Sequence, residues 1–220
     1  MRPARPARRV SSWRSGLVAL LLIPLVAALA ACGAPTQTPP AVWSTSFDDG
    51  TGWVLSSDAV AEVGVTDGRL QVHVFSPGQL AWASSESTWQ DCRVIVSAMQ
   101  VSGPVDNEYG ILLRMDDDKS FYAFSVSGDG YVRIAHYADE VWSLLGADWS
   151  PSDAVNQGLA TNVLEVVAQG TELEFLVNGE TVAKSGDSEV TSGPIGLYAG
   201  AFSEGDVVVA FDDLSVTSAP

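Results

Sequence analysis

Residues 109–137 read YGILLRMDDDKSFYAFSVSGDGYVRIAHY, which is three apolar stretches separated by two short polar segments. The separating segments are Asp116-Asp117-Asp118-Lys119 and Gly128-Asp129-Gly130, whose aspartates and glycines are typical of chain reversals. No 3.6-residue apolar period runs through this part of the chain, and the dominant period is two, which indicates β-strands. The stretch therefore predicts an antiparallel meander of three strands over 109–115, 121–127 and 131–137, with a fourth strand over 141–145.

The same pattern continues on both sides of the meander. Clean alternation is seen at Arg69–Val74, and the dipeptide Asn178-Gly179 is a strong hairpin signal because both turn residues must accept positive φ. Further strands are expected at 93–101, 162–168, 172–177, 181–184, 195–199 and 207–216. About a dozen short strands at regular spacing favour one all-β domain over residues 41–220, folded as a two-sheet antiparallel sandwich.

The register of the meander decides which side chains share a face. If Arg114 pairs with Phe121, and Ser127 with Tyr131, one face is apolar enough to form the core: Tyr109, Ile111, Leu113, Tyr122, Phe124, Val126, Val132 and Ile134. The opposite face then collects Leu112, Arg114, Phe121, Ser125, Ser127, Tyr131, Arg133, Tyr137 and, from the next strand, Trp142. This second face combines aromatic rings with two of the few cations, and no carboxylate is assigned to it. Exposed aromatic side chains without a partner are unusual on a monomer and favour a binding surface, although a covering loop or simple strand propensity would also account for them.

The N-terminal 31 residues have the layout of an export signal. They contain five arginines and no acidic residue, and an uncharged, mostly apolar run of 16 residues ends in Leu29-Ala30-Ala31-Cys32. The run is short for a spanning helix. The ending resembles the bacterial lipobox, which implies cleavage before Cys32 and lipidation of that cysteine; an ordinary cleaved signal and an uncleaved anchor are the alternatives. Residues 32–40 contain three prolines and are expected to form an extended tether. The protein is thus predicted to be lipid-anchored on the extracytoplasmic side of the cell membrane.

The remaining 189 residues carry 27 acidic and 6 basic side chains, a formal net charge of −21. This charge excludes nucleic-acid binding through a general basic surface, because phosphate binding needs clustered Lys and Arg. It also disfavours electrostatic adhesion to anionic lipid, so the membrane is expected to be contacted through the lipid anchor only.

Several short motifs carry a family resemblance. They are Phe47-Asp48-Asp49-Gly50 before Trp53, Gly110-Ile111-Leu112-Leu113-Arg114, Phe121-Tyr122-Ala123-Phe124, Val177-Asn178-Gly179, Gly193-Pro194-Ile195-Gly196-Leu197 and Phe211-Asp212-Asp213-Leu214. Their succession resembles the concanavalin A-like, laminin-G-like jelly rolls, and more narrowly the 3-keto-disaccharide hydrolase-type domain of bacterial surface lipoproteins. The resemblance implies a jelly-roll sandwich, and it makes hydrolysis of a glycoside an alternative function. Most of the matching residues are turn and core residues, so the function does not follow from them.

The residues themselves offer little catalytic chemistry. A glycosidase needs two carboxylates facing one bond, and the Glu-x-Asp-x-Glu strand of laminarinase-type relatives is absent. Glu172 and Glu174 share a strand face but are expected to lie on a solvated surface opposite Leu173. Cys92 is expected to be a buried apolar residue. The loop acids Asp106, Glu108 and Asp139 are left as groups that could reach the aromatic face.

Calcium is the one cofactor for which ligands exist. The doublets Asp48-Asp49 and Asp212-Asp213 flank the first and last strands, which are neighbours in many sandwiches of this type, and Asp116-Asp117-Asp118 is a second candidate. The alternative is that these aspartates only form turns.

These observations favour a non-catalytic module that binds a glycan or cell-envelope polymer. Tyr131, Tyr137 and Trp142 would stack on the ligand, Arg114 and Arg133 would anchor it, and Phe121 and Ser125 would complete the site. A hydrolase and a protein–protein adhesion or assembly module are the two rival functions.

Overall fold

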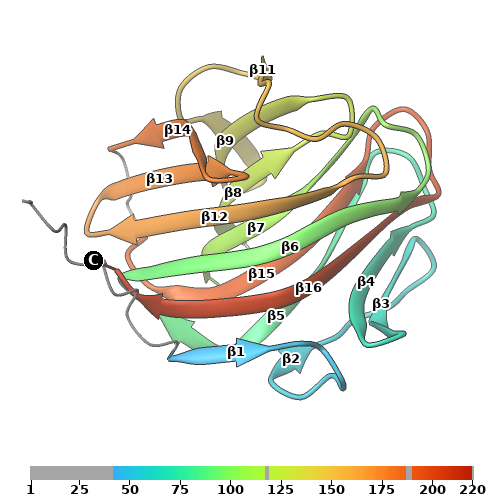
Figure 1. The fold of residues 1–220 in the computed structure, drawn as a ribbon, viewed down its shortest axis with the longest axis horizontal. Helices are drawn as coiled ribbons and strands as arrows, with labels where there is room; N and C mark the ends of the chain where they lie inside the picture. The colour runs from blue at the N-terminus through green and yellow to red at the C-terminus, as the bar shows by residue number, and fades with distance from the viewer. Residues whose placement is uncertain (1–41, 117–118, 187–189, 220) are drawn as a thin grey trace, which may run out of the picture. The chain divides into compact units, whose positions relative to one another are not determined.

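The computed structural model describes residues 42–116, 119–186 and 190–219. The predicted signal segment 1–31, the tether 32–40 with Cys32, and Asp117 and Asp118 lie outside the described residues. Sixteen strands and no helix are found in the described ranges, and they form two antiparallel sheets. Figure 1 shows one of these sheets, called sheet A below, in front of the other, called sheet B. The all-β sandwich predicted from the sequence is confirmed. No helix in these ranges is long and apolar enough to cross a membrane.

Sheet A runs, in spatial order, through β14 (Glu180–Ser185), β13 (Glu172–Val177), β12 (Thr161–Gln169), β6 (Cys92–Ser102), β16 (Val207–Ser218), β4 (Arg69–Val74) and β3 (Ala61–Thr66). The short β1 (Trp43–Thr45) also pairs with β16, so the first and last strands are neighbours as expected.

Sheet B runs through β10 (Val141–Leu144), β9 (Tyr131–Ala138), β8 (Ser120–Val126), β7 (Asn107–Asp116), β15 (Gly193–Ala201), β5 (Gln79–Trp89) and β2 (Trp53–Val54). The two-residue β11 (Ser150–Pro151) pairs with the start of β9.

The register assumed between β8 and β9 is confirmed, and that between β7 and β8 holds as far as Leu113; the assumed pair of Arg114 with Phe121 is not formed, because a register shift follows Leu113. Leu113 pairs with Tyr122, Phe121 with Tyr137, and the Ser127 N–H donates to the carbonyl of Tyr131 at 2.9 Å. All eight side chains assigned to the inner face belong to the main core between the sheets. Because side chains alternate along a strand, the same register fixes which residues point away from the core.

The hairpin turn predicted at Asn178-Gly179 is also confirmed. Asn178 and Gly179 close the β13–β14 hairpin with φ of 52° and 84°, the conformation that the Asn-Gly pair predicts.

One long strand was not predicted. β5 carries three serines and alternates poorly, yet it covers eleven residues and bonds to both β15 and β2. Ser85 is buried within it, and its hydroxyl donates to the carbonyl of Ser87 at 2.7 Å and accepts from the Ile195 N–H at 3.0 Å. The internal bonds of this serine remove the cost of burying a polar side chain.

Candidate functional site

The outer face of sheet B, meaning the side turned away from the main core, holds a second cluster of packed side chains. Its buried members are Leu112, Met115, Phe121, Ala123 and Tyr198, and its half-buried members are Leu80, Trp82, Tyr137 and Trp142. The rings of Phe121 and Tyr137 stack at 5.1 Å, and Trp142 lies 5.0 Å from Tyr137. Aromatic side chains from β5, β8, β9, β10 and β15 therefore form a continuous apolar surface on this sheet.

A buried ion pair lies beside the aromatic cluster. Arg133 Nη2 is 2.9 Å from Glu108 Oε2, and only 14% of the arginine side chain and 6% of the glutamate side chain are exposed. The Tyr198 hydroxyl donates to the same Glu108 oxygen at 3.3 Å and is hydrogen-bonded to Ser125. Burial raises the pKa of Glu108, and the positive charge of Arg133 opposes that rise. Burial and the neighbouring Glu108 charge raise the pKa of Tyr198 well above its ordinary value.

Two glycines make room for the side chains of Glu108 and Tyr198. A Cβ on Gly200 would lie 2.8 Å from Glu108 Cγ, and a Cβ on Gly110 would lie 3.3 Å from the Tyr198 ring and clash with the carbonyl of Phe124. The central strands β7 and β15 can hold Glu108 and Tyr198 only because these neighbouring positions lack side chains.

The guanidinium of Arg133 is also held by two indoles. Its Cζ is 4.6 Å from the Trp149 ring centroid and 5.3 Å from that of Trp142. Trp149 comes from the segment between β10 and β11, which leaves the edge of β9 after Leu144 and returns at Ser150. Cation–π contacts of this kind contribute about 0.5 to 2 kcal/mol each. The arginine is thereby fixed in position before any ligand arrives.

The predicted site residues are divided by the structure into accessible and buried groups. Tyr131 is 38% exposed, and Arg133, Tyr137 and Trp142 are partly exposed on the outer face. Phe121 and Ser125 lie on the same face but are 3% and 0% exposed, so they support the surface from below and do not reach its solvent side.

The prediction that Arg114 lies on the aromatic face is wrong. A register shift follows Leu113, Arg114 adopts φ of 54°, and its side chain is 1% exposed. Arg114 Nη2 lies 3.6 Å from Asp91, and Nη1 donates to the carbonyl of Val190 at 3.4 Å. The bulge turns this arginine into an internal contact, which strand parity cannot anticipate.

Parity assigned no acid to the aromatic face, but Glu108, one of the three acids left as able to reach it, lies there. Glu108 belongs to β7 and not to a loop, and it shares the parity of Leu112. Extending the predicted strand by one residue toward the N-terminus would have placed Glu108 on this face. Trp149 could not be found in this way because its segment has no apolar period.

A small hollow adjoins the aromatic surface at the β8–β9 turn. Its volume is about 180 Å³, and it is lined by Asp106, Ser127, Asp129, Tyr131, Trp149 and Phe202. The Trp149 and Phe202 rings meet edge to face at 5.8 Å. Tyr131 and Trp149 thus belong both to the outer face and to the hollow.

The aspartate doublets gain no support as a metal site. Asp48, Asp49 and Asp213 line one open groove, but Asp48 accepts a hydrogen bond from Ser46 at 3.0 Å and Asp49 accepts one from the Thr51 N–H at 2.9 Å, as turn-forming residues do. Over residues 42–116, 119–186 and 190–219, no group of three or more carboxylate, imidazole or thiol side chains is arranged to hold a metal ion. Asp116 is exposed, and its two neighbours lie outside these ranges. The calcium site stays a prediction.

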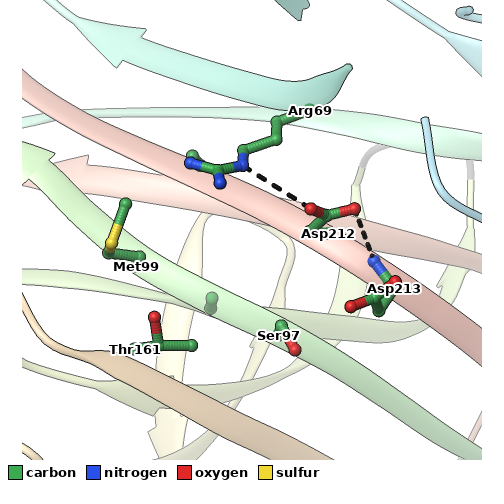
Figure 2. Close-up of a pocket in the computed structure, with 8 residues that line it drawn as sticks. Arg69, Ser97, Met99, Thr161, Asp212 and Asp213 are labelled. Carbon is green, nitrogen blue, oxygen red and sulfur yellow. Dashed lines mark hydrogen bonds and ion pairs between the residues drawn. The ribbon is translucent and has the colours of Figure 1, made fainter. Parts of the chain in front are cut away.

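Asp212 takes part in a different hollow, on sheet A. In Figure 2 the Asp212 carboxylate is paired with Arg69 and accepts a hydrogen bond from the Asp213 N–H, while Met99 on β6 and Thr161 on β12 also line the hollow. The distance from Arg69 Nε to Asp212 Oδ2 is 3.5 Å. The volume is about 200 Å³, and the Arg69 and Asp212 side chains are 47% and 34% exposed. An exposed ion pair of this kind contributes little energy and indicates no ligand.

Other predicted assignments are confirmed. Leu173 is buried, while Glu172 is exposed and Glu174 forms an ion pair with Lys184 at 3.0 Å. Cys92 is 2% exposed, and burial raises the pKa of its thiol to about 11.

Comparison with known proteins shows which fold this is. No protein-family model and no curated protein matches the sequence. Among solved structures, the carbohydrate-binding module CBM66 from Bacillus subtilis superposes with a TM-score of 0.62 at 20% identity, covering 76% of this chain and 96% of the module. The fold is a concanavalin A-like jelly roll.

Two further structures share the jelly roll. Bacillus licheniformis β-glucanase has a TM-score of 0.60 at 14% identity and covers 84% of this chain and 100% of the enzyme. A Bacillus subtilis protein described as galectin-like has a TM-score of 0.58 at 11% identity and covers 82% of this chain and 97% of its own. At these identities the similarity establishes the fold of this jelly roll, while its function has to be argued from its own residues.

Proposed function

We propose that this protein is a non-catalytic module that binds a glycan or cell-envelope polymer through the outer face of sheet B. The observation that carries the proposal is the position of Arg133, which is bonded to a buried carboxylate and enclosed by two partly exposed indoles. The rings of Tyr131, Tyr137 and Trp142 offer flat apolar surfaces for the faces of sugar rings, and the guanidinium offers N–H donors to hydroxyl groups.

Rigidity of the surface supports binding. A site whose side chains are already held in place loses less conformational entropy when a ligand binds. Here the ion pair holds Arg133, and ring packing at 5.0 Å and 5.1 Å holds Trp142 and Tyr137. The neighbours in fold include a protein named as a carbohydrate-binding module and one named as a β-glucanase, which is consistent with a glycan as ligand.

The carboxylates favour binding over catalysis. Glycoside hydrolysis needs two carboxyl groups about 5 to 9.5 Å apart across one bond. Glu108 is the one buried carboxylate in the described part of the outer face, and Arg133 and Tyr198 already occupy one of its oxygens.

Hydrolysis is the second candidate, and one observation favours it. Burial raises the pKa of Glu108, as a general acid requires. Under that alternative, Glu108→Gln abolishes turnover of a glycoside and leaves binding intact. Under the proposal, no turnover is measured with the unaltered protein.

The module is proposed to be lipid-anchored outside the cell membrane through Cys32, as the N-terminal sequence predicts. Labelled palmitate should be incorporated by the unaltered chain and not by Cys32→Ser. Incorporation by that variant would contradict the anchor without affecting the binding proposal.

A glycan array probed with the full-length chain tests binding, with Tyr131→Ala and Trp142→Ala as site variants. Phe75→Ala is the matched control, because Phe75 is 36% exposed, close to the 38% of Tyr131, and lies directly after β4 of sheet A. Binding to a defined glycan that is lost in both site variants and kept in the control supports the proposal. Failure to bind any glycan would refute it and favour the protein–protein module.

A further inference from the structure

We infer that the hollow lined by Asp106, Ser127, Asp129, Tyr131, Trp149 and Phe202 binds a protonated amine, so that the glycan recognised by this protein carries amino sugars. The claim that the ligand is a glycan rests on the proposed function, whereas the claim that the hollow binds an amine does not. It concerns the end of the outer face nearest the β8–β9 turn.

Four separate segments of the chain build the hollow. Asp106 directly precedes β7, Ser127 and Asp129 belong to the β8–β9 turn, and Tyr131 begins β9. Trp149 precedes β11, and Phe202 follows β15. The turn is held in place by Ser127, whose hydroxyl lies 2.6 Å from Asp129 Oδ1 and 3.2 Å from the carbonyl of Val105.

The lining of the hollow carries two acidic side chains, Asp106 and Asp129. Neither Asp106 nor Asp129 forms an ion pair with any residue in the described ranges. The nearby cation, Arg133, lies on the Trp149 ring and is paired with Glu108. An anionic ligand would meet like charge here, whereas a cation would gain two carboxylate partners.

The remaining walls suit the same ligand. Tyr131, Trp149 and Phe202 bring three aromatic rings to the hollow. The faces of such rings attract ammonium groups, and rings of this kind form the cages that recognise alkylammonium ligands. Carboxylates together with aromatic rings are therefore the chemistry of an amine site, whereas a neutral sugar would gain no charge–charge attraction from Asp106 and Asp129.

The size of the hollow limits what enters it. About 180 Å³ is less than the roughly 300 to 1,000 Å³ of pockets for drug-sized ligands, so the hollow holds a substituent or one ring. Because Tyr131 and Trp149 also belong to the outer face, an amine can enter the hollow while the rest of the glycan lies along the aromatic surface.

Titration calorimetry with the full-length chain at pH 6 tests the inference. The probes are a β-1,4-linked glucosamine hexamer, its fully N-acetylated counterpart and tetramethylammonium chloride. The variants are Asp106→Asn and the double variant Asp106→Asn/Asp129→Asn. Asp67→Asn, on the β3–β4 turn of sheet A, removes the same charge outside the hollow and controls for general attraction to an acidic domain.

The glucosamine hexamer should bind at least about tenfold more tightly than the N-acetylated hexamer. The double variant should lose about tenfold in affinity for the amine and keep its affinity for the N-acetylated hexamer, while the control keeps both. Equal binding of the two hexamers, or an equal loss in the control, would overturn the inference.

The third probe separates the two proposals. Suppose that neither hexamer binds, but tetramethylammonium shifts the Trp149 indole N–H resonance, assigned with Trp149→Phe, and the double variant abolishes the shift. The amine site then stands and the glycan function fails. If neither the hexamers nor tetramethylammonium has any effect, both proposals are overturned.

Discussion

Replacing Arg133 by methionine should destabilise the protein, because it leaves the Glu108 carboxylate buried without its partner. The glutamate side chain is 6% exposed and the arginine side chain 14%. Removing one member of a buried pair costs about 3 to 5 kcal/mol, and the slight exposure of Arg133 favours the lower end. Methionine keeps apolar contact with the two indoles, which offsets part of the lost cation–π energy. We expect a loss of about 3 kcal/mol in the free energy of unfolding at pH 7.5.

The loss should depend on pH in a defined direction. Burial already raises the pKa of Glu108 above its ordinary value of 4.5, and removing the opposing charge of Arg133 raises it further. At pH values between the pKa of Glu108 in the unfolded chain and its higher pKa in the folded protein, the folded state binds a proton on Glu108 that the unfolded state has lost. The free energy of unfolding therefore falls as pH rises, by about 1.4 kcal/mol per pH unit. Below the unfolded pKa Glu108 is neutral in both states, and the penalty from this group disappears.

Urea unfolding followed by tryptophan fluorescence at pH 5.0 and 7.5 measures both effects. Arg133→Met should cost clearly more at pH 7.5 than at pH 5.0, each compared with the unaltered protein at the same pH. The double variant Arg133→Met/Glu108→Gln should recover to within about 1 kcal/mol of the unaltered protein, because it buries no charge. A cost below about 1 kcal/mol at both pH values, or a double variant as unstable as Arg133→Met, would refute the reasoning.

Three further predictions concern the scaffold. The Cys92 thiol is 2% exposed and has a pKa of about 11, so it should react slowly with a disulfide reagent. In a Cys32→Ser background at pH 8, we expect the reaction to be at least about a hundredfold slower in the folded protein than in urea. Equal rates would contradict the burial of Cys92. Asn162→Ala should cost about 2 to 3 kcal/mol in urea unfolding, because this fully buried amide makes four hydrogen bonds of 2.8 to 3.1 Å, and a loss under about 1 kcal/mol would show that the network is dispensable. Gly110→Ala should lower the free energy of unfolding by about 2 kcal/mol or more, because the new Cβ would meet the backbone of β8. Gly64→Ala should be neutral or stabilising, because a Cβ there meets nothing within 4 Å. Similar effects of the two substitutions would count against the close contact between the strands at Gly110.

The central meander was predictable because its local and tertiary requirements agree. Alternation over 121–126 and the glycine-rich turn at 128–130 set the register, and the two-residue period then assigns the inner face. The same logic fails at Arg114, where a bulge rotates the side chain into the protein. It also fails over β5, whose serines hide a strand that is stabilised by pairing with β15.

The candidate site was only half predictable for a related reason. Tyr131, Arg133, Tyr137 and Trp142 could be placed on one face by parity alone. Glu108 was missed only because the predicted strand began too late. Tyr198 and Trp149 could not be joined to the others, since they come from β15 and an irregular segment, and pairing between strands distant in the sequence leaves no local signal.

The sequence by itself determined the fold class, the principal hairpins, the inner face of the meander and the acidic character of the domain, because each depends on residue spacing, turn chemistry or composition. The tertiary structure alone decided that Arg133 is neutralised by Glu108, that Trp149 encloses it, and that Asp106 and Asp129 remain without a cation among the described residues. Charge compensation depends on distances of a few ångströms between separate strands, and those distances exist only once the two sheets have formed.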